Sequence, residues 1–346
     1  MARKGRRRAE QAGLVYVDYH GPGISRRRCG RGFSFFDPDG NIIRGSDRQR
    51  LVTLAVPPIW DRVWMSINPD GHLLATGIDP AGRRQYRYHP RWSEVAAQTK
   101  YHGLALFGHR LPRLRRRVRR DLNDRRLSHR RVTAGVVRLL DRGHLRIGSR
   151  RYFDSRGTAG ATTLTADDVR MEEDHIELDF VGKSGRQRHV EIRDSKLADL
   201  LTECSELDGQ FLFHYIDRHG EGVPIRSNDV NRYLRRHMGR AVTAKDFRTW
   251  TGCVTAWEWL NGAGRRERAG RAKAASMIRV VSERLGNTPS VCRAAYIDPR
   301  LTAMADGSEP CIHASADECR RSELSVAESS FMAWLTRAGA SLKIAA

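Results

Sequence analysis

The feature that most constrains the fold is a change in hydrophobic period near Trp92. Before it, residues 32–88 contain short apolar stretches separated by turn signals: Asp37-Pro38-Asp39-Gly40, Pro69-Asp70-Gly71 and Asp79-Pro80-Ala81-Gly82. Turn signals between apolar stretches are typical of antiparallel hairpins. After it, apolar residues recur with helical spacing, beginning with Trp92, Val95, Ala96 and Thr99. We therefore predict an α+β chain, with a small N-terminal antiparallel β-sheet domain and a larger, mainly α-helical domain that carries a β-hairpin.

The length of 346 residues suits two such domains. We predict a basic N-terminal arm and first strand region at 1–30, of which about the first ten residues are mobile, and a β-rich domain at 31–89. A mainly helical domain at 90–303 and a tail with a terminal helix at 304–346 follow.

Within the helical part, residues 169–193 alternate as strands do, and the turn 182–185 makes them a hairpin. Helices are expected at about 195–204, 227–239, 245–261 and 270–285. Asp246 is the expected N-cap of the third, which puts Arg248 in its first turn, off the buried stripe. Asn287 is expected to end the fourth as a left-handed cap, and Thr288-Pro289 to begin the next.

The net charge is +22 and the pI is about 10.6, a balance that attracts polyanions and nucleic acid above all. Residues 109–132 concentrate this charge. Leu114, Val118 and Leu122 predict one amphipathic helix with a cationic exterior, which includes Arg116 and Arg119. A solvated charged face is the alternative. Because the run offers few acidic partners within the helix, we favour contact with phosphates.

Several functional classes lack their motifs. "VGKS" at 181–184 has no preceding glycine at the P-loop spacing, so no ATP site is expected. The six cysteines form no CxxC pair, and "CIHASADEC" at 311–319 has the wrong spacing for a zinc knuckle. No apolar run approaches the roughly 18 residues of a membrane span. We therefore expect no cofactor, no metal, no membrane partner and a cytoplasmic location.

Four blocks, in order, suggest a specific family: "HLRIGSRRY", "LDFVGKSGRQRH", "KDFRTWTG" and "LGNTPSVCRAAYIDP". Over roughly residues 30–300 the chain resembles the poxvirus-like bacterial type IB DNA topoisomerases. The resemblance implies a tyrosine nucleophile at Tyr296, arginines at Arg146 and Arg248, and a hairpin lysine at Lys183. The fifth position, His or Asn in that family, is Asn287, which can donate a hydrogen bond but cannot transfer a proton.

The resemblance also implies the reaction. Tyr296 attacks a backbone phosphate, a 3′-phosphotyrosyl link forms, and the released 5′-hydroxyl later attacks back, so that supercoiled duplex relaxes without ATP or metal. Lys183 would protonate the leaving oxygen, and the arginines would stabilise charge on the nonbridging oxygens.

DNA contacts are expected in both domains. "RRQYRY" resembles the segment that the family places at DNA, which implies contacts from Arg83, Arg84, Gln85, Tyr86 and Tyr88. A half-exposed strand of alternating polarity is the alternative. The 31–89 domain and the catalytic 90–303 domain are expected to clamp the duplex as a monomer in the bacterial nucleoid, with a hinge at His89-Pro90.

Two other classes share parts of this pattern. A tyrosine recombinase has the same nucleophile and arginines, but it usually carries His-x-x-Arg, and here Lys245 occupies the histidine position. Its N-terminal domain is helical, whereas residues 30–88 are predicted to be strands. A non-catalytic basic DNA-binding protein is permitted by the charge alone, but the five catalytic-type residues argue against it.

Overall fold

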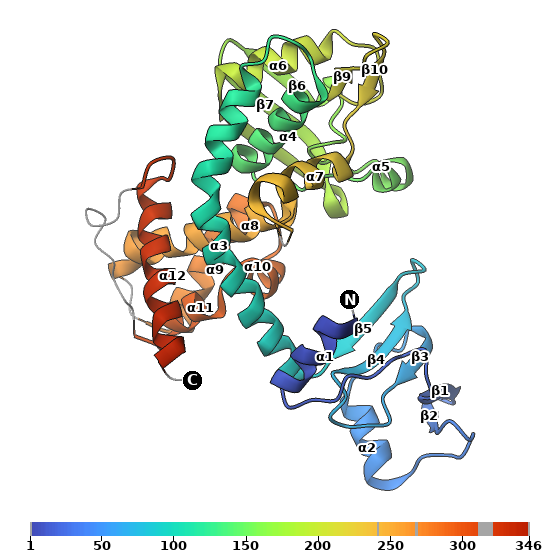
Figure 1. Ribbon diagram of the computed structural model, residues 1–346. Helices are drawn as coiled ribbons and strands as arrows, with labels where there is room; N and C mark the ends of the chain where they lie inside the picture. Colours follow the sequence, from blue (N-terminus) through green and yellow to red (C-terminus); the bar gives the residue numbers. More distant parts are fainter. Residues whose placement is uncertain (1, 241, 267–268, 311–320, 345–346) are drawn as a thin grey trace. The chain divides into compact units, whose positions relative to one another are not determined.

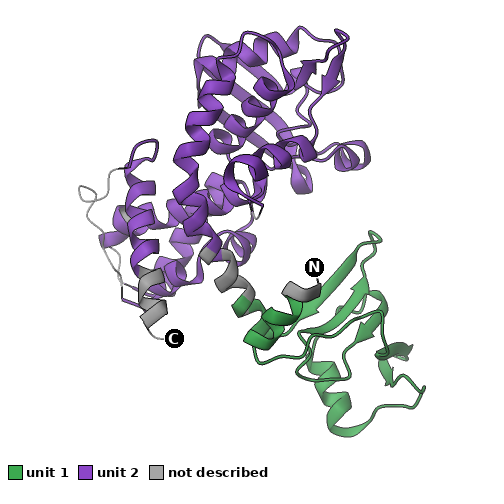
Figure 2. Cartoon of the chain, viewed as in Figure 1, with its two compact units in different colours: residues 1–100 green, residues 101–346 purple. Residues whose placement is uncertain are grey.

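The computed structural model describes residues 2–240, 242–266, 269–310 and 321–344. The chain forms two compact units, residues 1–100 and 101–346 (Figures 1 and 2). The predicted α+β class is confirmed, because an antiparallel sheet dominates the first unit and helices dominate the second. The division between the units falls within helix α3 (Pro90–Leu122).

The first unit is built on a five-stranded antiparallel sheet with the strand order β2-β1-β3-β4-β5. The strands are β1 (Ile24–Cys29), β2 (Gly32–Phe36), β3 (Asp61–Met65), β4 (Leu73–Ile78) and β5 (Arg84–Tyr88). Their inward residues meet helix α2 (Gly45–Thr53), whose Leu51 is buried beside Phe35 and Met65. The two turns expected at 69–71 and 79–82 lie between β3 and β4 and between β4 and β5.

Three details of the first unit differ from the prediction. Helix α2 was not expected in the β-rich stretch. A hairpin was expected around Asp37–Gly40, but only a turn forms there, closed by the single bridge Phe36↔Ile42. Strand β2 pairs with β1 instead. The expected mobile arm is helix α1 (Ala2–Gln11). It is held because Ala9 is fully buried in a cluster that includes Trp92.

The second unit is mainly helical and also contains a three-stranded sheet, β6-β7-β8 (Figure 1). In β7 (His175–Gly182) and β8 (Arg186–Arg193), Ile176 pairs with Ile192 and Leu178 with Val190, so the predicted hairpin is confirmed. Strand β6 (Val169–Glu172) lies on the other side of β7. The remaining strands, β9 (His214–Ile216) and β10 (Gly222–Pro224), form a separate ribbon.

The helices are α4 (His129–Gly143), α5 (Arg150–Arg156), α6 (Ser195–Ser205), α7 (Ser227–Met238), α8 (Ala244–Asn261), α9 (Arg271–Leu285), α10 (Pro289–Ala295), α11 (Pro299–Asp306) and α12 (Val326–Ile344). The four helices predicted between 195 and 285 are α6, α7, α8 and α9. The helix predicted over 109–132 is wrong as one element. Helix α3 ends at Leu122, and α4 begins after Ser128, whose hydroxyl accepts from the Arg131 amide.

Several arginines of the 109–132 run have protein partners. Arg117 pairs with Asp121 in the same helix at 2.9 Å, and Arg110 donates to the Met238 carbonyl. Arg119 pairs with Glu323, whereas Arg116 is exposed. The prediction considered only acidic partners within the helix. Tertiary contacts supply further partners, so part of the arginine run stabilises the fold.

Helix α12 is docked on α8 through aromatic rings and a buried ionic network. The ring centroids of Trp250 and Phe331 lie 5.4 Å apart. Glu328 pairs with Arg115 at 2.8 Å and also accepts from the Trp250 indole N–H at 2.9 Å. Arg115 pairs with Asp141 at 2.8 Å as well. The C-terminal helix is therefore part of the core that supports α8.

We expect Glu328→Ala to lower the free energy of unfolding by about 3 kcal/mol, because it removes one carboxylate of a largely buried ionic network and leaves the Trp250 N–H without its acceptor. Urea denaturation of the two proteins measures this. Glu258→Ala, which removes an exposed carboxylate from α8, is the matched control and should change stability by less than about 0.5 kcal/mol. Equal effects of the two substitutions would contradict the structural role of the network.

Candidate active site around Tyr296

Tyr296 lies at the end of α10, held against α8 by its backbone. Thr288 caps the start of α10, with Pro289 in its first turn, as predicted. The Cys253 thiol donates to the Tyr296 carbonyl at 3.3 Å. A Cβ on Gly252 would lie 2.6 Å from that carbonyl oxygen, so only glycine permits this approach of α8. The Tyr296 side chain is consequently fixed and 7% exposed.

Arg248 lies over the Tyr296 ring, with its guanidinium carbon 5.2 Å from the ring centroid. It donates to the carbonyl of Leu285 at 2.8 Å and to that of His144. These carbonyls belong to the C-terminal ends of α9 and α4, where the helix dipole favours a cation. In the described part of the chain Arg248 has no carboxylate partner, and its Nε has no acceptor.

Two predictions about Arg248 are corrected. Thr243 is the N-cap of α8, and Asp246 accepts from the Thr243 amide at 2.7 Å as the third residue of the helix. Arg248 therefore lies beyond the first turn. It is also 2% exposed rather than off the buried stripe, because the ends of α4 and α9 enclose that side of α8. Burial is the main reason that its pKa falls to about 10, which leaves it protonated at neutral pH.

Arg146 and Asn287 contact each other beside this pair. Arg146 lies in the loop after α4 and donates to the Asn287 side-chain carbonyl. The Asn287 side-chain N–H₂ is buried and has no partner in the described residues. The left-handed cap of α9 is Gly286, with φ +58°, and not Asn287 as predicted. The backbone N–H of Asn287 still contributes to the cap, because it donates to the Ser282 carbonyl at 3.0 Å, and only the side-chain donor is left without an acceptor in the described residues.

The charges around Tyr296 favour loss of its proton. Burial raises the pKa of the phenol, but the positive charges nearby lower it by more, so that its pKa lies below the ordinary value. The contributing side chains are Arg248, Arg146 and Lys245. A phenol in this setting is a better nucleophile than a free tyrosine at neutral pH.

Lys183 is the predicted site residue that the structure does not bring into this cluster. It is exposed at the tip of the β7–β8 hairpin, where Ser184 adopts a left-handed φ of +68°. In the described portion of the chain it makes no hydrogen bond or ion pair. Four of the five predicted catalytic residues therefore lie together, and the fifth projects from the hairpin tip.

Sequence reasoning missed two residues beside the cluster. His144 adopts φ +55° at the end of α4, which directs its carbonyl to Arg248. Arg188, on the inward face of β8, packs against Gly286. Its place in the strand alternation was visible in the sequence, since it precedes Val190 and Ile192 on that face.

The pKa of His144 is lowered to about 4, first by burial and then by the charge of Arg284. At pH 5 the unfolded chain binds a proton at this histidine and the folded chain does not, so folding stability falls as pH drops from about 6.5 towards 4. We expect wild type to lose up to about 3 kcal/mol more than His144→Asn over this window. Urea denaturation at several pH values measures the stability of the two proteins. Parallel curves of stability against pH would contradict this prediction.

The segment predicted to contact DNA divides into two faces of β5. Tyr86 and Tyr88 are each 42% exposed and stack with ring centroids 5.9 Å apart. Arg84, on the same face, lies over the ring of Tyr19 at 5.0 Å. Gln85 and Arg83 instead bond the Asp79 carboxylate, at 2.8 Å and 2.6 Å, and so stabilise the β4–β5 turn.

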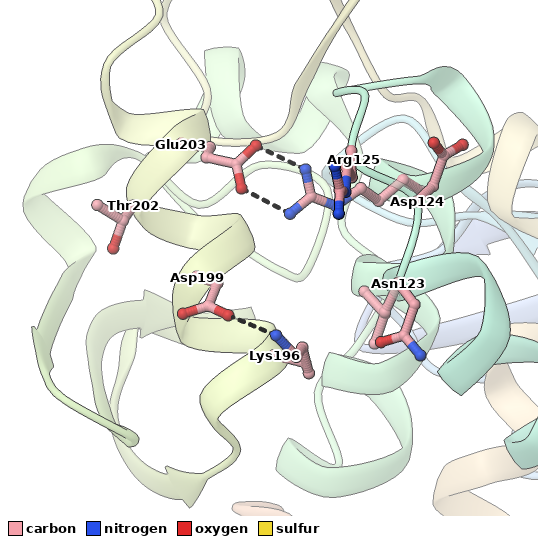
Figure 3. A pocket seen from close by; sticks show the side chains of 9 residues that line it. Asn123, Asp124, Arg125, Lys196, Asp199, Thr202 and Glu203 are labelled. Carbon is pink, nitrogen blue, oxygen red and sulfur yellow. Dashed lines mark hydrogen bonds and ion pairs between the residues drawn. The ribbon is translucent and has the colours of Figure 1, made fainter.

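A large cavity lies apart from Tyr296. It measures about 700 Å³, lies where α3, α4 and α6 meet, and is lined by none of the five candidate residues (Figure 3). Most of its charged side chains are paired: Arg131 with Glu203 at 2.6 Å, Lys196 with Asp199 at 3.1 Å and Asp124 with Arg130 at 3.0 Å. Most of the charge that lines this cavity is therefore already neutralised within the protein.

Within the described ranges, no group of three or more His, Cys, Asp or Glu residues could hold a metal ion. The "CIHASADEC" segment considered for zinc lies outside the described residues. None of the helices in those ranges is long and apolar enough to cross a membrane.

Comparisons with known proteins agree with this arrangement. The family model "Eukaryotic DNA topoisomerase I, catalytic core" matches residues 90–313, and "Bacterial DNA topoisomerase IB, N-terminal domain" matches residues 32–79. A DNA topoisomerase 1B of Acanthamoeba polyphaga mimivirus is 27% identical over 285 residues, which are 80% of this chain and 85% of the relative.

Among solved structures, the XerH site-specific recombinase bound to its difH substrate in a pre-cleavage complex matches 58% of this chain and 53% of its own, at 15% identity and a TM-score of 0.33. The post-cleavage complex of XerH with palindromic difH matches 58% and 52%, at 14% identity and the same TM-score. The catalytic-core match covers more than half of the residues, and with the bacterial N-terminal match it shows that the chain belongs to the type IB DNA topoisomerases.

Proposed function

We propose that this topoisomerase relaxes supercoiled duplex DNA through a transient 3′-phosphotyrosyl bond to Tyr296, without ATP or a metal ion. The observation that carries the proposal is the buried Arg248 guanidinium over the Tyr296 ring, with no carboxylate partner in the described residues. A buried cation without a counter-ion is costly, and an anionic phosphate would compensate it.

In the proposed cleavage step, Tyr296 releases its phenolic proton to water, and its oxygen forms a bond to phosphorus as the bond to the 5′-oxygen breaks. Arg248 and Arg146 would donate to the nonbridging oxygens, where negative charge accumulates. The unpartnered Asn287 N–H₂ supports a further donor role at the same phosphate. These side chains offer stabilisation without a bound cation.

The leaving 5′-oxygen requires a proton. Lys183 is the candidate donor, because its exposed position on the hairpin tip leaves the ammonium free to reach a bound strand. In religation the same lysine would take the proton back from the 5′-hydroxyl, and the Tyr296 oxygen would depart.

We propose that both units bind the duplex as a clamp formed by one chain. Arg84, Tyr86 and Tyr88 offer one face of β5 for phosphate and sugar contacts. Arg116 is exposed on α3 and suits a phosphate contact. Arg83, Gln85 and Arg119 would have to leave, or share, the carboxylates that they bond in the free protein.

Incubation with negatively or positively supercoiled plasmid, in EDTA and without ATP, tests the proposal. We expect complete relaxation of both substrates, because side chains fill every role in the step. Strict dependence on a divalent ion or on ATP would overturn it. Strand exchange between two duplexes would instead indicate a recombinase, which shares the nucleophile but differs in product.

A further inference from the structure

Arg188 is a residue of the β7–β8 hairpin whose side chain reaches Gly286, next to Asn287. It belongs to β8, opposite Phe180 of β7. Along β8 the side chains at 188, 190 and 192 share the inward face, and Ile192 on that face is 5% exposed. Arg188 is the first residue of this inward face and is half-buried. Its guanidinium therefore points towards the helical core rather than into bulk water.

The guanidinium of Arg188 rests on the backbone of Gly286, the residue before Asn287. A Cβ at Gly286 would lie 1.5 Å from Nη1 of Arg188 and 2.3 Å from its Cζ. Any side chain at 286 would therefore displace the guanidinium, in addition to the strain of its φ of +58°. Because Gly286 has no side chain, the guanidinium of Arg188 can lie beside Asn287 and Arg146.

The electrostatic surroundings of Arg188 are cationic. In the described ranges it has no hydrogen-bond acceptor and no carboxylate partner. Burial lowers its pKa first, and the charge of Arg146 lowers it further. Two other arginines of this unit that are shielded from solvent do have carboxylate partners, since Arg138 bonds Asp194 and Arg131 bonds Glu203. Arg188 lacks such a partner, which indicates that its counter-ion comes from a ligand.

We propose that Arg188 is a third guanidinium of the phosphate site, which contacts a nonbridging oxygen of the phosphate that Tyr296 attacks. The inference rests on the proposed function. Arg188 transfers no atom or proton: Tyr296 loses its phenolic proton to water, its oxygen bonds to phosphorus, the bond to the 5′-oxygen breaks, and Lys183 protonates the leaving 5′-oxygen. Arg188 offsets the negative charge of the phosphate during this exchange.

The test compares cleavage of two oligonucleotide duplexes, one with an ordinary scissile phosphodiester and one with an uncharged methylphosphonate there. We expect Arg188→Ala to slow covalent-adduct formation on the phosphodiester about 10²-fold relative to wild type. On the methylphosphonate, which lacks the charge that Arg188 would offset, the defect should fall to within about threefold of wild type on the same substrate.

Arg193→Ala is the matched control. It removes an exposed arginine from the same strand on the opposite face, and should leave adduct formation unchanged on both substrates. Arg188→Lys, which keeps a positive charge, should recover part of the rate on the phosphodiester. Equal defects of Arg188→Ala on the two substrates would overturn the proposal and make Arg188 a support for Gly286. If wild type itself forms no adduct with the phosphodiester, the proposed function fails rather than the role of Arg188.

Discussion

Tyr296→Phe is expected to abolish covalent adduct formation while leaving DNA affinity within about twofold of wild type. Removing the nucleophile of a hydrolytic triad costs about 10⁶-fold in rate, and the loss here should be at least about 10⁵-fold. The fold should persist, because the contacts that hold this residue are made by its backbone and by the ring beneath Arg248. A denaturing gel of labelled duplex detects the adduct, and a filter-binding assay measures affinity.

The control for this substitution is Tyr233→Phe. Tyr233 is buried to the same degree, 8% exposed against 7%, and its hydroxyl donates to Asp121 at 2.7 Å. Loss of that hydrogen bond should cost about 1 kcal/mol of stability and leave the adduct intact. An adduct formed by Tyr296→Phe would show that another residue is the nucleophile.

Lys183→Ala is expected to slow cleavage of ordinary DNA by about 10²–10⁴-fold, the usual contribution of a general acid. The defect should largely disappear on a substrate whose 5′-bridging oxygen is sulfur, because a thiolate leaves without a proton. The exposed hairpin tip supports this role, since no contact in the described residues holds the ammonium back. Single-turnover cleavage of the two substrates measures the effect.

Two variants control for charge in that experiment. Arg248→Ala should be impaired on both substrates, because charge on the nonbridging oxygens stays uncompensated when sulfur replaces the bridging oxygen. Lys196→Ala removes another exposed lysine of the same unit, one that pairs with Asp199, and should cleave normally. If Lys183→Ala shows the same defect on oxygen and sulfur, the lysine acts by its charge alone and the general-acid role is wrong.

Local patterns in the sequence predicted part of the second unit, whereas α4, α5, α11, β9 and β10 were not expected. The helices between 195 and 285 and the 176–192 pairing follow from spacing that each segment carries by itself. The prediction for the β-rich residues 32–88 was less complete. Helix α2 was missed because its helical periodicity is weak, and it is positioned by the burial of Leu51 in the core under the sheet. Helix α1 is held by contacts with Trp92, which no local pattern encodes.

The candidate catalytic residues came from the family resemblance and not from spacing. The family assignment is confirmed, whereas the roles of Tyr296, Arg146, Arg248, Asn287 and Lys183 are predictions that the experiments above address. The sequence offered no reason to choose Arg248 among so many arginines, because a surface position was the ordinary expectation for each.

By itself, the sequence determined the class of fold, the helices between 195 and 285, the hairpin and a charge suited to DNA, since these depend on neighbouring residues and on totals. Tertiary structure alone decided which cations are buried and which are paired. The carbonyls that bury Arg248 come from His144 and Leu285, 104 and 37 residues away. The carboxylates that neutralise Arg115 come from α4 and α12. Such partners meet only when distant helix ends and faces pack together, so no local pattern could separate the arginines of the site from those of the scaffold.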